Sequence, residues 1–152
     1  MIRIIEDDLR GPEIAELLTA HLDAMRDHSP PESVHALDLD ALRVPEISVW
    51  TAWIGDELAG CGAMKQLDPA HGEIKSMRTA AAHLRKGVAA SILEHMINVA
   101  RNRGYRRLSL ETGSSGPFTA AHRLYESFGF TSCDPYGDYT DVIFSRYFTL
   151  SL

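Results

Sequence analysis

GEIKSMRTAAAHLRKGVAASILEHMINVA, residues 72–100, is the stretch of sequence that decides the fold. Residues 73–79 are predicted as a strand, and a short turn connects them to a helix. The helix is indicated by an apolar stripe at i, i+4 and i+5 spacing, which comprises Val88, Ile92, Leu93, Met96, Ile97 and Ala100. Gly104 is a natural residue to end this helix, because glycine readily adopts the left-handed conformation found after a helix. The stretch therefore encodes a strand–turn–helix unit.

The turn of this unit has the composition of an anion-binding site. Gly87 and the small Ala89 at the helix start leave backbone N–H groups accessible, and the helix dipole favours negative charge there. Arg85 and Lys86 add positive charge. The stretch is not a P-loop, since two glycines at the required spacing before Lys-Ser/Thr are lacking. A single glycine in a turn is usually only a turn, so this segment alone does not establish phosphate binding.

The rest of the chain divides into strands and helices at turn signals. Helices are predicted from Pro12 to the Ser29-Pro30-Pro31 break, over 38–42, and from Ser114 or Ser115, either of which can cap a helix, to Phe128. Further strands are predicted at 2–6, 47–54, 58–67, 105–111, 130–133 and 142–150. This order indicates an α/β or α+β sheet with helices on both faces. The length of 152 residues suits one domain, residues 1–152.

Composition excludes several classes of function. The formal net charge of −6 argues against a nucleic acid or an anionic membrane as the main partner. No apolar run approaches the roughly 20 residues that span a bilayer, and the start at Met1 shows no signal-peptide pattern, so we expect a cytoplasmic protein. The seven histidines and two cysteines show no metal-ligand spacing, so we expect no metal. Cys61 and Cys133 are expected to be reduced thiols in or near a core.

Two segments resemble the GNAT superfamily of acetyl-CoA-dependent N-acetyltransferases, and Ser-Pro-Pro-Glu-Ser (29–33) with Glu-Ile-Lys-Ser-Met (73–77) resembles its small bacterial members. Leu84-Arg85-Lys86-Gly87-Val88-Ala89 is similar to the family's (Gln/Arg)-x-x-Gly-x-(Gly/Ala) pyrophosphate loop. Leu124-Tyr125-Glu126-Ser127-Phe128-Gly129-Phe130 is similar to its Leu-Tyr-x-x-x-Gly-Phe segment. The resemblance implies a mixed, mainly antiparallel sheet that splays between its fourth and fifth strands, with acetyl-CoA in the gap. It also implies that the amine attacks the thioester directly, so that neither cysteine is needed as a nucleophile.

The resemblance assigns the residues that bind acetyl-CoA. It places the pyrophosphate on Leu84, Arg85, Lys86, Gly87, Val88 and Ala89, and the pantetheine arm beside Met77, Arg78 and Thr79, paired with the backbone like an added strand. Two positions depart from the family pattern. Leu84 stands where Gln or Arg is usual, which removes a side-chain contact to phosphate. Phe118 stands where many members carry an Asn that helps to hold the arm.

Two residues are implied for catalysis. Tyr125 corresponds to the general acid that protonates the departing thiolate; with a phenol pKa of about 10 and a thiol pKa of about 8.5, full transfer is uphill by roughly 2 kcal/mol. Glu73 corresponds to a base for the amine, although a free Glu lies about six pKa units below an alkyl ammonium. Glu111 is the rival base. From spacing alone, Tyr125 also fits an ordinary core position, and Glu73 an ordinary ion pair with Lys75.

The acceptor is expected to be a small-molecule amine that also bears a carboxylate. The stiff loop around Pro30-Pro31 offers His28, Ser29, Glu32, Ser33 and His35, and Lys75 and Arg78 would lie opposite. Strand alternation predicts one face with Glu73, Lys75 and Met77, and the other with Ile74, Ser76 and Arg78. Two alternatives remain open: an acyl-CoA-binding sensor without turnover, and an acetyltransferase for protein lysines or N-termini. The sequence also leaves open a homodimer.

Overall fold

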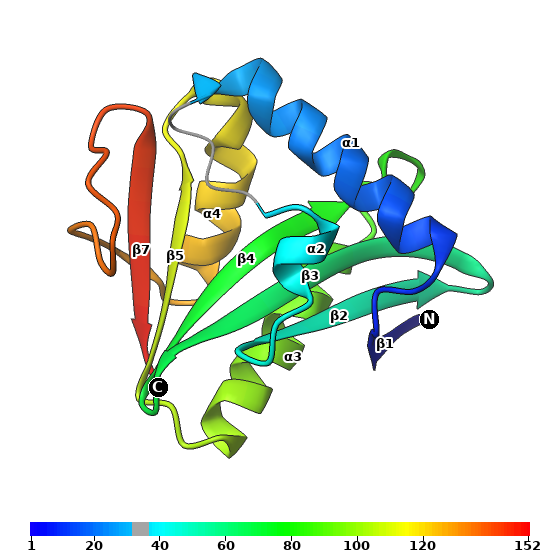
Figure 1. Cartoon of the computed structure of the whole chain (residues 1–152), viewed down its shortest axis with the longest axis horizontal. Coiled ribbons are helices and arrows are strands. Elements are labelled where there is room, and N and C mark those ends of the chain that lie inside the picture. The colour runs from blue at the N-terminus through cyan, green and yellow to red at the C-terminus, as the bar shows by residue number, and fades with distance from the viewer. Residues whose placement is uncertain (32–36) are drawn as a thin grey trace.

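The computed structural model describes residues 1–31 and 37–152, and its centre is one seven-stranded sheet (Figure 1). The strand order is β1-β2-β3-β4-β5-β7-β6. Every pairing is antiparallel except β4–β5, which is parallel. The strands are β1 (Ile2–Glu6), β2 (Ile47–Ile54), β3 (Glu57–Asp68), β4 (His71–Thr79), β5 (Arg107–Gly113), β6 (Thr131–Cys133) and β7 (Ser145–Ser151). The predicted mixed, mainly antiparallel sheet is therefore confirmed.

Helices cover both faces of this sheet, as predicted (Figure 1). One face carries α1 (Pro12–His28) and α2 (Leu39–Leu42), whose Ile14, Leu18 and Leu42 form a core with β2 and β3. The other face carries α3 (Val88–Asn102) and α4 (Thr119–Ser127). The whole apolar stripe predicted for α3 is buried there: Val88, Ile92, Leu93, Met96, Ile97 and Ala100.

The parallel pair β4–β5 separates along its length. The two strands pair only from His71 opposite Arg107 to Ile74 opposite Leu110. Beyond that point β4 continues to Thr79 and β5 to Gly113 without pairing to each other, and Figure 1 shows them diverging. The edges that face each other across this gap hold backbone N–H and C=O groups for which the sheet provides no partner. This gap is the splay that the resemblance implied.

A bulge in β4 corrects the predicted alternation of side chains. Arg78 lies opposite Cys61 and Lys75 opposite Ala63, so that Ser76 and Met77 together face the single residue between them on β3. Ser76 adopts a φ of 54°. The extra residue moves Met77 onto the α3 face and Arg78 onto the α1 face, where Cys61 and Ala63 pack. The prediction that Met77 shares a face with Glu73 and Lys75 is therefore wrong.

Most predicted boundaries hold within about two residues, and three differ. Strand β7 begins at Ser145 rather than at Val142, and Val142 is 71% exposed. Strand β5 begins at Arg107, after a buried Tyr105 that lies outside the strand. Gly116–Phe118 forms a separate 3₁₀ turn before α4, and neither this turn nor α4 has a side-chain cap. The chain enters the helix through this 3₁₀ turn, which contains Pro117, so that α4 begins only at Thr119.

Candidate active site

The turn before α3 has the backbone of an anion cradle. Arg85 (φ 64°) and Gly87 (φ 80°) both lie in the left-handed region, and they turn the chain so that α3 begins at Val88. The first turn of α3 contains no acidic residue. A Cβ on Gly87 would meet no described atom within 4 Å, so the turn opens onto space beside the helix N-terminus. These features fit a phosphate group held by backbone N–H groups.

The side chains of this loop point in different directions. Leu84 is 58% exposed and makes no contribution to the core. Lys86 Nζ lies 3.1 Å from Nδ1 of His83, and Nε2 of the same buried histidine lies 2.9 Å from a carboxylate oxygen of Glu57. His83 therefore donates to Glu57 and accepts from Lys86, an arrangement that fixes the lysine beside the cradle. Val88 is buried under the sheet, and Ala89 is half-buried.

The free edge of β4 leads from this cradle toward the splay. Its residues Met77, Arg78 and Thr79 pair with β3 on one side and, among the described residues, with no strand on the other. A ligand with amide groups can therefore add to this edge as a strand would. The predicted positions for the pantetheine arm lie on this edge, and the predicted positions for the pyrophosphate lie on the turn that follows it.

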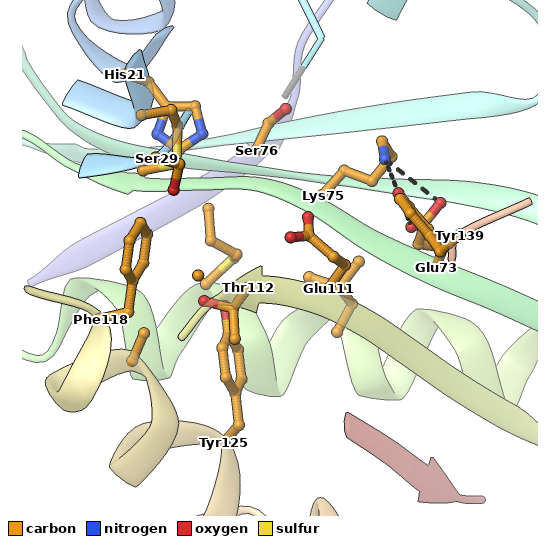
Figure 2. A pocket seen from close by; sticks show the side chains of 15 residues that line it. His21, Ser29, Glu73, Lys75, Ser76, Glu111, Thr112, Phe118, Tyr125 and Tyr139 are labelled. Carbon is orange, nitrogen blue, oxygen red and sulfur yellow. Dashed lines mark hydrogen bonds and ion pairs between the residues drawn. The ribbon is translucent and has the colours of Figure 1, made fainter. Parts of the chain in front are cut away.

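A pocket lies in the splay, walled by α1, β4, β5 and α4 (Figure 2). It encloses about 740 Å³ of space, its open mouth included. Its lining combines apolar side chains with a few polar ones: His21, Met25, Ser29, Glu73–Met77, Glu111–Gly113, Phe118, Ala121, Tyr125 and Tyr139. Both predicted catalytic residues and the rival Glu111 are thus brought together.

Tyr125 reaches the pocket from α4. Its ring packs against Phe130 and Phe148, with centroids 5.8 and 6.3 Å away. Its hydroxyl has no hydrogen-bond partner among the described residues, although the residue is only 6% exposed. Burial raises the pKa of Tyr125, and the charge of Glu111 raises it further. The phenol is therefore protonated at every physiological pH and is available as a donor at the pocket wall.

Glu73 is engaged by a network of donors. Oε2 accepts hydrogen bonds from the hydroxyls of Tyr139 (2.6 Å) and Tyr136 (2.8 Å), and Oε1 lies 3.4 Å from Nζ of Lys75. The Lys75 ammonium also donates to the Tyr139 hydroxyl at 2.9 Å. Glu73 is only 3% exposed to solvent. The pair Glu73–Lys75 is therefore a buried, hydrogen-bonded ion pair at one side of the pocket.

Glu111 lies between this network and Tyr125 in Figure 2, with its carboxylate directed toward β4. It is half-buried at the end of the paired part of β5, and Oε2 accepts a hydrogen bond from Ser145 at 2.7 Å. The side chain faces the pocket from the strand opposite Lys75 and Ser76. Two carboxylates therefore approach the same cavity from the two diverging strands.

The predicted acceptor residues fall into three groups. Ser29 and Lys75 line the pocket. His28 is exposed at the end of α1 and packs edge-on against Phe118, with ring centroids 6.3 Å apart. Glu32 and His35 lie outside the described residues. Phe118, where the family often carries Asn, is buried in the pocket wall and fills the space that a Cβ on Gly113 would take.

Sequence reasoning missed Tyr136, Tyr139 and His21. The two tyrosines belong to the connection between β6 and β7, whose last three residues the sequence predicts as strand. Their rings pack on each other at 5.2 Å between centroids. Two tyrosines in a Pro-, Gly- and Asp-rich segment, DPYGDY, are the signal that could have indicated them, because aromatic side chains in a loop rarely lack a packing partner.

Other features bear on what the site excludes. Cys61 is free and buried, and burial raises the pKa of its thiol to about 12, which makes it a poor nucleophile. Cys133 is also free and is partly buried. Within residues 1–31 and 37–152, no three histidine, cysteine or acidic side chains come together as metal ligands would. The same residues contain no helix with the length and apolarity to cross a bilayer.

Known proteins share both the sequence and the fold. The model of the Acetyltransferase (GNAT) family matches residues 13–130. A Bacillus subtilis (strain 168) protein named "Uncharacterized N-acetyltransferase YsnE" is 58% identical over 96% of this chain and 97% of its own length. The Escherichia coli (strain K12) protein named "Uncharacterized N-acetyltransferase YedL" is 49% identical over 100% and 96%.

A solved structure shows that the fold is also similar. The GNAT family acetyltransferase from Elizabethkingia anophelis, with acetyl-CoA bound, superposes with a TM-score of 0.74 at 22% identity and covers 99% of this chain and 98% of its own. At this identity the likeness shows the fold alone. Together with the family match and the two relatives, it leaves one conclusion. The chain belongs to the GNAT family of acetyltransferases.

Proposed function

We propose that this chain transfers an acetyl group from acetyl-CoA to the amine of a small molecule. The observation that carries the proposal is the convergence at one splay of three features. These are the cradle at 84–89, the free edge of β4, and an enclosed pocket that holds a protonated Tyr125 and two carboxylates. Each feature serves one part of a thioester substrate or one step of acyl transfer.

The residues fit acetyl-CoA, which supplies the acetyl group as a thioester. Backbone N–H groups after Gly87 would hold the pyrophosphate, with Arg85 and Lys86 adding positive charge. The unpaired backbone of Met77, Arg78 and Thr79 would pair with the amides of the pantetheine arm. The open space at Gly87 supports this placement, because any side chain there would occupy the cradle.

Tyr125 would act on the leaving group. As the amine nitrogen forms its bond to the acetyl carbon, the bond from that carbon to sulfur breaks, and the phenol proton passes to the sulfur. Since burial raises the pKa of Tyr125, this proton moves only as negative charge develops on sulfur. Because the hydroxyl makes no hydrogen bond to the described residues, donating its proton to sulfur disrupts no existing contact.

Glu111 is better placed than Glu73 to receive the proton of the amine. Both oxygens of Glu73 already face donors, namely two phenols and an ammonium, so neither is free to receive the proton of the amine. Glu111 faces the pocket next to Tyr125. It would bind the ammonium form of the acceptor and take its proton directly or through water, while Glu73 holds Lys75 in place.

A small acceptor is favoured by the enclosure of the pocket. Its walls come from α1, α4 and both diverging strands, and Tyr139 covers the side opposite α1. A protein lysine would have to thread an extended side chain between these elements. A concave pocket that combines apolar walls with a few polar groups at set positions is typical of sites for small molecules.

The test is acetyl transfer by the purified chain to a panel of small amines and to lysine and N-terminal peptides. Thiol release and the mass of the product are the two readouts. We expect acetylated small amines and no acetylated peptide. Acetylation of peptides alone would replace the proposal with a protein acetyltransferase. Calorimetric binding of acetyl-CoA without turnover of any acceptor would replace it with a sensor.

A further inference from the structure

Two polar side chains in the pocket wall lack partners. Ser76 is 8% exposed and His21 is 6% exposed, yet Ser76 Oγ and His21 Nδ1 are buried without a hydrogen bond to any described residue. The large majority of buried polar side-chain atoms in proteins are paired, and an unpaired one is costly. Both residues line the same pocket. The two atoms therefore indicate a ligand group that hydrogen-bonds at this wall.

Both side chains occupy positions that a purely structural role would not require. Ser76 occupies the left-handed position of the β4 bulge, which is unfavourable for a residue with a Cβ and is usual at functional sites. His21 follows Ile14, Leu17 and Leu18 on the buried face of α1, where an aliphatic side chain would pack without a polar cost. Figure 2 shows His21 beside Ser29, and Ser76 on β4 between His21 and Lys75.

The electrostatic environment of this wall is positive. Arg78 comes two residues after Ser76 on the same face of β4 as Lys75, and its guanidinium forms no ion pair or hydrogen bond with the described residues. Its charge acts on His21: burial first, and then Arg78, lower the pKa of His21 to about 4. The imidazole is therefore neutral at pH 7 and has an N–H to donate. Lys75, by contrast, is already occupied by Glu73 and Tyr139.

The pocket thus carries groups of opposite electrostatic character. Glu111 supplies negative charge beside Tyr125, and the wall formed by His21 and Ser76 supplies donors backed by the charge of Arg78. Met25 and Phe118 also line the pocket and add apolar surface to it. A ligand complementary to this arrangement carries an ammonium at one end and an anion at the other.

We propose that His21 and Ser76 bind a carboxylate of the acceptor, and that the acceptor is therefore an amino acid or a related amino carboxylate. The inference rests on the proposed acetyl transfer, and it assigns recognition of the carboxylate to His21 and Ser76, with Arg78 behind them, rather than to Lys75. His21 Nδ1 and Ser76 Oγ each donate one hydrogen bond to the carboxylate. The amine is then directed toward Glu111.

The first test compares matched acceptors. Amino acids such as alanine, phenylalanine and 4-aminobutanoate are each assayed beside the amine that remains when the carboxylate is removed, and beside the corresponding amino alcohol. We expect the carboxylate form of the preferred pair to have a kcat/KM at least tenfold higher. Equal use of the carboxylate and the plain amine, or preference for the alcohol, would overturn the inference.

The second test uses variants that remove one hydrogen bond each. Ser76→Ala and His21→Leu should raise the KM of the amino acid about tenfold or more, and leave the KM of acetyl-CoA and the turnover of the plain amine unchanged. His21→Asn, whose amide reaches the position of Nδ1, should recover most of the affinity. Ser76→Ala should fold with an unchanged or higher Tm, because it removes an unpaired buried hydroxyl. Equal losses for amino acid and plain amine would contradict the assignment.

A binding measurement separates this inference from the proposed activity. The histidines are labelled, and the His21 ring signal is assigned by its loss in His21→Leu. Amino acids are then titrated into the coenzyme A-saturated chain and into the free chain. A change in the NMR chemical shift of the His21 ring on adding amino acids, and none on adding the matched amines, supports the carboxylate site even if no acetyl transfer occurs. If an amine is acetylated but no amino acid shifts the His21 signal, the carboxylate site is overturned while the activity stands.

Discussion

The hydroxyl of Tyr139 lies 2.6 Å from Oε2 of Glu73, although the two residues are far apart in the sequence. This contact joins the β6–β7 connection to the strand that borders the splay. It also limits what Glu73 can do, because an oxygen that already accepts a charge-assisted hydrogen bond is not free for the substrate. The same contact raises the pKa of Tyr139, after the effects of its burial and of the nearby charge of Glu73.

We predict that Glu73→Gln destabilises the fold more than it changes the chemistry. Lys75 would keep a nearly buried charge without its counter-charge, which typically costs about 3 kcal/mol, or about 6–12 °C in Tm for a chain of this size. Thermal unfolding measures this effect. Glu94→Gln, on an exposed site of α3, is the matched control and should change the stability by less than about 0.5 kcal/mol. A stable Glu73→Gln with a rate lost chiefly at low pH would restore Glu73 as the base.

We predict that Tyr125→Phe lowers kcat by about 10- to 10⁴-fold and leaves acetyl-CoA affinity and stability nearly unchanged. Its hydroxyl makes no hydrogen bond to the described residues, so the fold loses little. Steady-state kinetics, calorimetry and thermal unfolding give the three values. Tyr105→Phe is the complementary control. The Tyr105 hydroxyl lies away from the pocket and donates a hydrogen bond to Gln66 Oε1 over 3.2 Å. That variant should lose about 1 kcal/mol of stability and keep kcat. An unchanged kcat in Tyr125→Phe, with chemistry rate-limiting, would make Tyr125 a core residue only.

We predict that Gly87 is needed for coenzyme A and not only for its backbone conformation. Gly87 and Gly104 lie just before and just after α3, with φ of 80° and 83°, and a Cβ on either would meet no described atom within 4 Å. An alanine at either position should therefore cost a similar 1–2 kcal/mol, roughly, in unfolding free energy. Only substitution at Gly87 should weaken coenzyme A binding, and Gly87→Glu should abolish it. Calorimetry that finds equal affinities in folded Gly87→Glu and Gly104→Glu would remove the cradle from residues 84–89.

The elements that the sequence predicted well are those with local signals. The stripe of α3 and the Ser29-Pro30-Pro31 end of α1 depend on neighbours within a few residues, and the structure confirms both. The bulge at Ser76 was not predictable, because alternation along β4 depends on pairing with β3 and a serine gives no sign of positive φ. The Tyr136 and Tyr139 contacts with Glu73 depend on how β7 brings its preceding loop back to β4, a long-range result that no local pattern encodes.

We predict that His21 makes the protein lose stability in mild acid. Its pKa is lowered to about 4 in the folded chain, chiefly by burial, whereas an unfolded histidine has a pKa of about 6.5. Between these values the unfolded state binds more protons. The contribution is therefore fully present above pH 6.5, and it is lost as the pH falls toward 4. The difference is on the order of 3 kcal/mol.

Urea unfolding of the wild type and of His21→Leu at pH 7 and pH 4.5 measures this contribution. His21→Leu should lose about 2–3 kcal/mol less than the wild type on acidification. His71→Gln is the comparison: burial also lowers the pKa of His71, but this side chain is more exposed and bonded to Ser109, so its removal should flatten the dependence less. Equal acid losses in the wild type and His21→Leu would show that His21 reaches solvent and is not held neutral. The wall of the pocket that it forms would then be open, and the proposed carboxylate contact would lose its buried donor.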